Sequence, residues 1–305
     1  MISFTTKVKD EVSKIETNKL ESISELLSYL IFNSDFINNR IVVSVENNSV
    51  ARRVFSLIKR IYGINVKLTV RLQKKFKIKT FYILEIIEKT DIIKADMDEI
   101  IKHIKEYSEE EKYGFLKGVF MACGSVNDPS TSKYHLEFII KDEQLSYLVT
   151  NLLISLGLNG KVIKREKGYM VYLKSSEEIS DFIKMLGANN SLFYYEDIRI
   201  YRDHKNMVNR LNNCEQANVE KSLKTCNEQL KNIEYLEESD LIDLLDEKTR
   251  LVIEYRKKYP ESTMSELADI ISLETDMSIT KSGINHHFRK INELVHVSKS
   301  KVDIN

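Results

Sequence analysis

The chain has 305 residues, 42% of them apolar and 30% charged, and its 46 basic residues balance its 46 acidic residues to a formal net charge of zero. This composition suits a soluble globular protein of about two domains. No run approaches the roughly 18 apolar residues of a membrane span, the first residues lack the apolar stretch of a signal peptide, and the scattered Cys123, Cys214 and Cys226 argue for reduced thiols in a cytoplasmic protein.

The first half of the chain alternates between helical and strand patterns. Apolar residues recur at helical spacing from Leu20 to Ile31, and this spacing predicts the first helix. Two further helices are predicted at Val50–Ile61 and Ile92–Ile104. The predicted strands are Ile41–Val45, Val66–Arg71 and Phe81–Ile87.

A basic segment, from Asn47 to Leu84, contains no acidic residue and is expected to project a strong positive field. Basic side chains between Lys74 and Lys79 alternate with apolar ones, which is typical of a strand with one basic face. A curved sheet with such a face suits the DNA backbone. A basic face that merely keeps the protein soluble is the alternative. The expected DNA contacts here are Arg71, Lys74, Lys75 and Lys77.

The second half repeats the order of the first, which indicates an internal duplication. Its predicted helices are Tyr113–Ala122, Gln144–Leu156 and Ile179–Leu186, and the last two are ended by Gly157 and Gly187. Its predicted strands are Tyr134–Ile140, Lys161–Lys164 and Gly168–Leu173. We therefore expect an α+β fold with two tandem α-β-β-α-β-β-α halves, residues 1–105 and 106–202.

The opening helix of the second half carries Gly114, Gly118 and Ala122 at every fourth position, so two helix backbones are able to approach closely there. The sequence from Leu116 to Gly124 resembles the LAGLIDADG motif of homing endonucleases, and Leu27 to Asp35 is a weaker match in the first half. In that family the paired helices cross at a pseudo-two-fold axis below a saddle-shaped sheet.

The resemblance also locates the positions where each paired helix of the family delivers a metal-binding carboxylate. These positions are occupied by Ser34 and Cys123, which we interpret as degenerate metal positions. A hydroxyl and a thiol do not replace two hard carboxylate ligands of a divalent metal. Asp35 is one residue late and is expected to point about 100° around the helix. We expect no catalytic residue, no metal and no other cofactor.

A polar helical pattern from Asn206 to Leu236 and the acidic run Glu237–Asp240 predict a connector helix and a hinge at residues 203–243. Arg202 and Arg210, near the start of this helix, are candidates to extend the DNA-binding track. Ordinary ion pairs with neighbouring acidic residues are the alternative role for them.

Residues 244–305 are predicted to form a helix-turn-helix domain. A first helix covers Asp246–Tyr259 and is stopped by Pro260. Thr263 and Glu266 form a capping box that begins a second helix. A third helix opens at Lys281, after a connecting segment that is longer than the usual turn.

The third helix has the features of a recognition helix. Its buried stripe is predicted to be Ile284, Phe288, Ile291 and Leu294. On the other face, an asparagine amide matches adenine and an arginine matches guanine or phosphate. The expected DNA contacts on this helix are Lys281, Ser282, Asn285, His286, Arg289 and Lys290. A three-helix packing module without DNA contact is the alternative, and a metal at the paired histidines is not expected.

Several longer strings resemble the WhiA family of bacterial sporulation and cell-division regulators. They include Cys123–Pro129, Val208–Asn218 and Ser278–Ile291 and follow the family's order over nearly the whole chain. The resemblance implies a degenerate LAGLIDADG domain joined to a C-terminal helix-turn-helix. It further implies a DNA-binding regulator linked to cell division and chromosome segregation.

We therefore expect a non-catalytic, nucleoid-associated protein that regulates transcription in cell division, chromosome segregation or sporulation. Double-stranded DNA is the expected partner, with RNA polymerase or another regulator as a candidate protein partner. No membrane and no small-molecule substrate is expected. The alternatives are an active LAGLIDADG endonuclease and a structural division or chromosome-organising protein that acts through protein contacts.

Overall fold

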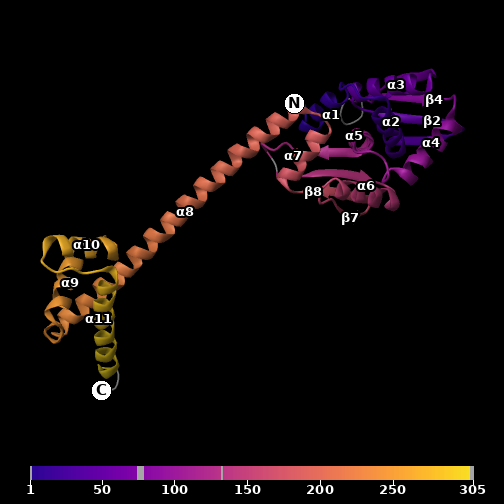
Figure 1. The fold of residues 1–305 in the computed structure, drawn as a ribbon. Coiled ribbons are helices and arrows are strands. Elements are labelled where there is room, and N and C mark those ends of the chain that lie inside the picture. The colour runs from indigo at the N-terminus through magenta and orange to yellow at the C-terminus, as the bar shows by residue number, and fades with distance from the viewer. Residues whose placement is uncertain (1, 74–78, 132, 303–305) are drawn as a thin grey trace. The chain divides into compact units, whose positions relative to one another are not determined.

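The computed structural model describes residues 2–73, 79–131 and 133–302 (Figure 1). The chain separates into an N-terminal unit, residues 1–203, and a C-terminal unit, residues 204–305. None of the described helices combines the length and the apolar character that a membrane span requires. All three cysteines are free thiols, as predicted.

The first half of the N-terminal unit has the predicted element order. It consists of α2 (Lys19–Asn33), β1 (Ser34–Ile37), β2 (Arg40–Val45), α3 (Asn48–Tyr62), β3 (Val66–Gln73), β4 (Lys79–Ile86) and α4 (Thr90–His103). The strands form one antiparallel sheet in the order β1-β2-β4-β3. The sequence pattern does not delimit β1, because four mostly exposed residues give no readable alternation.

The second half repeats this topology, so the predicted duplication is confirmed. Its elements are α5 (Glu109–Cys123), β5 (Gly124–Val126), β6 (Leu136–Ile140), α6 (Glu143–Ser155), β7 (Lys161–Arg165), β8 (Gly168–Leu173) and α7 (Ser176–Met185). The sheet order β5-β6-β8-β7 corresponds to that of the first half, strand for strand. Gly157 and Gly187 follow α6 and α7 with positive φ angles of 84° and 76°, which favour glycine.

Helices α2 and α5 pack against each other and form a spine between the two halves (Figure 1). A Cβ atom at Gly114 would collide with the carbonyl oxygen of Glu21, and one at Gly118 with that of Glu25. Both glycines therefore allow the close approach that their spacing predicts. Because the contacts advance in the same order on both helices, α2 and α5 run in the same direction.

Ion pairs reinforce this spine from inside the fold. The buried Lys117 of α5 pairs with Glu21 of α2 at 2.6 Å. Arg53 of α3 donates hydrogen bonds from Nε and Nη2 to the two carboxylate oxygens of Glu25, both at 2.7 Å. The buried carboxylate is thus compensated by a two-pronged pair, the strong geometry for arginine and carboxylate.

An N-terminal helix, α1 (Phe4–Val12), was not among the predicted elements. Its apolar residues Phe4, Val8 and Val12 recur every fourth position and are all buried. Thr5 joins it to the second half, because its Oγ1 donates to the carbonyl oxygen of Val126 at 2.8 Å and accepts from Val126 N at 2.9 Å. This short helix is held mainly by tertiary contacts, which a local pattern does not reveal.

A single helix, α8 (Asn189–Glu238), contains the predicted connector and begins well before Asn206. Its first turn belongs to the N-terminal unit, where Glu11 accepts hydrogen bonds from the backbone N–H groups of Asn190 and Ser191. After its end the chain turns at Asp240, whose φ is 52°. The predicted acidic hinge therefore contains the helix terminus and a left-handed turn residue.

The C-terminal unit contains the three predicted helices, α9 (Glu247–Lys258), α10 (Met264–Glu274) and α11 (Lys281–Val302), after a short 3-10 turn at Ile242–Leu244. The predicted capping box of Thr263 and Glu266 is present at the start of α10. On α11 the buried stripe includes Val295, whereas the predicted Leu294 is only partly buried.

Candidate DNA interface

Ser34 and Cys123, which the sequence predicts to be degenerate metal positions, lie where α2 and α5 end. The hydroxyl of Ser34 is buried and has no hydrogen-bond partner among the described residues. Cys123 Sγ donates to the carbonyl oxygen of Val119 at 3.5 Å. Burial raises the pKa of the Cys123 thiol to about 12, so it is uncharged at neutral pH. Two neutral groups are poor ligands for a hard divalent cation.

A lysine from α1 lies close to the second of these positions. Burial lowers the pKa of Lys9 to about 8, and the Cys123 sulfur is the group that acts on it electrostatically. Its Nζ also lies 5.6 Å from the ring centroid of Phe120. An ammonium group beside a metal position opposes the binding of a metal ion.

The expected placement of Asp35 on a helix is wrong. Helix α2 ends at Asn33, and Asp35 is the second residue of β1, where it pairs with Val42. Successive strand residues point to opposite faces, so Asp35 and Ser34 are directed to opposite sides of the sheet. Within the described ranges, no group of three or more His, Cys, Asp or Glu side chains is arranged to hold a metal.

The basic segment projects less positive charge than its composition suggests at Arg53, whose charge is neutralised within the fold, whereas Arg60 stays exposed. Arg53 is paired with Glu25, and Arg60 donates a hydrogen bond to the hydroxyl of Ser22 on α2. Arg53 therefore adds little to the strong positive field that the sequence predicts for this segment. Composition misses this, because it does not show which side of α3 faces α2.

On the sheet surface away from the core, basic and acidic side chains lie together. The register places Lys67 beside Glu85, and their side chains pair at 3.6 Å. Arg40 also pairs with Glu85, at 3.4 Å. Arg71 is exposed on the same face, opposite Phe81 in the register. The predicted contacts Lys74, Lys75 and Lys77 lie outside the described residues.

The two arginines predicted on the connector differ in their surroundings. Arg202 donates from Nη1 to the carbonyl oxygen of Pro129 at 2.6 Å, and its guanidinium lies 4.9 Å from the ring centroid of Tyr134. It therefore holds α8 against the loop before β6. Arg210 lies farther along α8 and is exposed.

Helix α11 carries the side chains that the sequence predicts for a recognition helix. Thr280 caps its start by accepting a hydrogen bond from Gly283 N at 3.3 Å. Ile284, Phe288 and Ile291 are buried against α9 and α10. The opposite face exposes Ser282, Asn285, His286 and Arg289.

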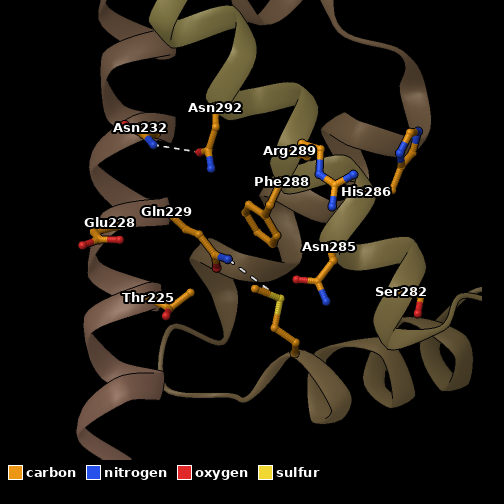
Figure 2. A pocket seen from close by; sticks show the side chains of 11 residues that line it. Thr225, Glu228, Gln229, Asn232, Ser282, Asn285, His286, Phe288, Arg289 and Asn292 are labelled. Atoms are coloured by element: carbon orange, nitrogen blue, oxygen red, sulfur yellow. Dashed lines mark hydrogen bonds between the residues drawn. The ribbon is translucent and has the colours of Figure 1, made fainter.

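This face forms one wall of a cleft of about 550 Å³ within the C-terminal unit (Figure 2). The other wall comes from α8, a contribution that sequence reasoning missed. Asn232 of α8 donates from Nδ2 to Asn292 Oδ1 of α11 at 2.9 Å and ties the walls together. Buried Cys226, Ile233 and Leu236 hold this part of α8 in the unit. The helical spacing of these three apolar residues is the feature of the sequence that indicates a buried side of α8. The α8 lining residues are Thr225, Glu228, Gln229 and Asn232.

Lys290 and His287 face α9 instead of the cleft. Lys290 Nζ donates to Asp246 Oδ2 at 2.8 Å, and His287 Nδ1 lies 2.8 Å from Thr249 Oγ1. Hydrogen bonds from Lys290 and Thr249 hold the pKa of Asp246 well below its usual range. Burial lowers the pKa of His287, so the neutral ring is favoured. The predicted contact Lys281 lies at the start of α11 and lines a second cleft.

Family models match the two halves and the C-terminal unit. The WhiA N-terminal LAGLIDADG-like domain matches residues 20–101, the WhiA LAGLIDADG-like domain matches residues 112–205, and the WhiA C-terminal HTH domain matches residues 208–295.

Full-length relatives are similar along nearly the whole chain. A probable cell division protein WhiA from Bacillus cytotoxicus is 38% identical over 306 residues, and one from Bacillus thuringiensis is 37% identical over 307 residues; each alignment covers 96% of both chains. The crystal structure of full-length WhiA from Thermotoga maritima is 24% identical, has a TM-score of 0.58 and covers 97% of this chain and 98% of that one. It supports the fold.

Proposed function

The chain belongs to the WhiA family of cell division proteins, and from this premise we propose that it is a non-catalytic regulator that binds duplex DNA. The observation that carries the proposal is the exposed face of α11 in an HTH domain. Asn285 and Arg289 stand one helical turn apart on this face and line the same cleft (Figure 2).

The proposed roles follow from the chemistry of these side chains. The amide of Asn285 is able to pair with adenine, and the guanidinium of Arg289 with guanine or a phosphate. Ser282 and His286 flank them and are proposed to contact the backbone, which positions the helix without reading sequence. We assign Lys290 a smaller role, because its ammonium group is paired with Asp246 at 2.8 Å.

The sheet of the first half is proposed to give secondary, sequence-independent support. Arg71 is exposed on the surface away from the core. Glu85 neutralises part of the charge beside it through Lys67 and Arg40. The contribution of this sheet to DNA affinity is therefore expected to be small compared with that of α11.

We propose that the LAGLIDADG-like halves no longer cut DNA. A buried hydroxyl, a protonated thiol and a nearby lysine provide none of the carboxylates that hold catalytic metal ions in phosphodiester cleavage. The paired helices then serve as a structural spine. Regulation of transcription in cell division, chromosome segregation or sporulation would place the protein in the cytoplasm on the nucleoid, with RNA polymerase or another regulator as a possible partner.

Replacement of Arg289 by alanine tests the recognition helix. On a site recovered by genome-wide mapping, Arg289→Ala should lose about 10- to 100-fold in affinity, as expected for a base contact of roughly 1–3 kcal/mol. Lys248→Ala removes the same charge from α9 and should change affinity by much less. Equal affinities for wild type and Arg289→Ala, measured by fluorescence anisotropy, would remove the recognition-helix assignment.

Two further measurements separate the competing functions. Supercoiled and linear DNA should stay intact in magnesium, whereas cutting that disappears in Asp35→Asn would identify an active endonuclease. A structural protein that acts only through protein contacts should show no duplex binding. A DNA binder should lose affinity steeply with salt, with a log-log slope of about one unit per phosphate neutralised.

A further inference from the structure

A second cleft in the C-terminal unit, about 620 Å³ in volume, has an unusual charge distribution. It lies between α8, the start of α10 and the start of α11. Its lining includes three cationic side chains, those of Lys221, Arg256 and Lys281, and none of the described residues that line it is an Asp or a Glu. The cleft is therefore a concentrated positive site within a protein of zero net charge.

Arg256 of α9 is the central observation. The residue is only 1% exposed, and the described residues offer it no carboxylate partner. Nη1 donates to the carbonyl oxygen of Ser262 at 2.6 Å, and the guanidinium lies 5.6 Å from the ring centroid of Phe288. Its Nε has no hydrogen-bond partner in the part of the chain that the structure describes. A buried charge without a counter-charge is costly.

The N-terminus of α10 adds neutral donors to the same cleft. The first backbone N–H groups of a helix have no acceptor within the helix. At α10 the cap Thr263 satisfies the N–H of Glu266, at 3.2 Å. Met264 and Ser265, the first two residues of α10, line the cleft, and their backbone N–H groups have no acceptor within the helix. The positive end of the helix dipole favours an anion at this place. Hydroxyls of Ser222, Ser262 and Ser265 also line the cleft.

We propose that this cleft is a phosphate-binding site, with Arg256 as its buried cation and Lys221 and Lys281 as exposed cations. A tetrahedral oxyanion accepts hydrogen bonds from several directions at once, which matches a guanidinium, two ammonium groups, a helix N-terminus and hydroxyls. The anion supplies the counter-charge that Arg256 lacks. Burial lowers the pKa of the Arg256 guanidinium, and the neighbouring Cys226 sulfur opposes this shift.

The phosphate has two possible sources. One is a phosphodiester of the duplex, because Asn285 of α11 lines both clefts; this source rests on the proposed function. The other is the phosphate of a free small molecule, which requires no DNA binding. The chemistry of the site is the same for both, and two measurements distinguish them.

The first measurement is thermal unfolding of the full chain in potassium phosphate and in potassium chloride of equal ionic strength at pH 7. Phosphate should raise the midpoint of the C-terminal unit saturably in the wild type. The double variant Lys221→Gln, Lys281→Gln should keep only the gradual rise that phosphate causes in any protein by exclusion from its surface. Both lysines are exposed, so this variant should fold, whereas loss of the buried Arg256 endangers folding. The double variant Lys231→Gln, Lys248→Gln removes the same number of exposed charges outside this cleft and is the matched control.

The second measurement is duplex binding as a function of salt. If the duplex supplies the phosphate, the double variant should lose affinity, its log-log salt slope should fall by about one unit, and inorganic phosphate should compete with the duplex. If a free ligand supplies it, duplex affinity should stay the same while the saturable thermal effect is lost.

The inference is overturned if wild type and double variant respond identically to phosphate and also share one salt slope. Should the wild type fail to bind any duplex, the proposed function fails, and the thermal measurement alone decides whether the phosphate site exists.

Discussion

The separation between α2 and α5 is set by two missing side chains. Gly114 and Gly118 leave room for the backbone carbonyl groups of Glu21 and Glu25, so the two helices touch through their main chains. The four-residue spacing of these glycines is visible in the sequence. Which helix they meet is not, because the partner residues lie about ninety positions earlier in the chain.

Gly118→Ala should destabilise the N-terminal unit by about 1–3 kcal/mol, because the added methyl group overlaps the Glu25 carbonyl oxygen and the Ser28 hydroxyl. Urea unfolding measures the effect. Gly160→Ala is the control, since its Cβ would meet chiefly the Leu153 side chain, at 3.1 Å, which is able to shift. Equal unfolding midpoints for the two variants would contradict the close helix contact.

The stability of the N-terminal unit should rise with pH between about 8 and 9. Lys9 has a pKa of about 8 in the folded chain, against an ordinary 10.5, so the unfolded chain binds more protons in this interval. The gain should be on the order of 1 kcal/mol. Denaturant unfolding at several pH values measures it, and Lys9→Met should abolish the rise.

Ionisation of Cys123 lowers the stability of the N-terminal unit at higher pH, the opposite of the effect of Lys9. Its thiol has a pKa of about 12 when folded, against an ordinary 9.0, so the folded chain keeps a proton that the unfolded chain loses, and stability falls above pH 9. Cys123→Ala should therefore extend the rise beyond pH 9. A flat profile between pH 8 and 9 in the wild type would show that the pKa of Lys9 is not lowered in the folded chain.

Among the elements, α11 and α8 differ in how much the sequence reveals. The capping box in the sequence predicts the start of α10, and the spacing of the apolar residues predicts the buried stripe of α11. The role of α8 as the second wall of the cleft is less visible, because its pattern is mostly polar and only a few positions such as Ile233 and Leu236 are buried. Helices that meet a small domain along a narrow stripe give weak periodicity.

The start of α9 depends on one carboxylate. Asp246 Oδ1 accepts from Thr249 N at 2.7 Å, and Oδ2 accepts from Lys290 Nζ at 2.8 Å. Asp246→Ala should destabilise the C-terminal unit by about 1–2 kcal/mol, as the loss of an N-cap does. Thermal unfolding measures this, with Asp243→Ala as the control, because that exposed acid makes only a 3.6 Å surface pair with Arg250.

The same cap has a pH dependence with a defined sign. The pKa of Asp246 lies below its ordinary 3.8 in the folded chain, so its contribution is complete above that value and is lost as the pH falls below about 4. The difference in stability between wild type and Asp246→Ala should shrink in acid. A difference that stays constant down to pH 2 would exclude an ionised cap.

At the scale of the whole molecule, the described residues form two hydrophobic clusters, one in each unit. Each cluster should unfold by its own transition. Leu267 has no exposed surface, so Leu267→Ala should reduce the free energy of unfolding of the C-terminal unit by about 2–5 kcal/mol. The unfolding transition of the N-terminal unit should not change. Leu30→Ala should do the reverse. Calorimetry measures both, and a single transition that moves with either variant would contradict independent cores.

The sequence by itself determined the duplication, the three-helix C-terminal unit and the family, and it places a serine and a cysteine, Ser34 and Cys123, at the two predicted metal positions. These properties depend on periodicity, caps and residue identity, which are local. Only the tertiary structure decided that Arg53 and Arg60 face α2, that Lys290 pairs with Asp246, and that Arg256 is buried with no carboxylate partner among the described residues. Whether a charged side chain contacts a ligand, forms a structural ion pair or lines a binding site depends on the residues around it in the folded chain. Those residues come from distant parts of the sequence.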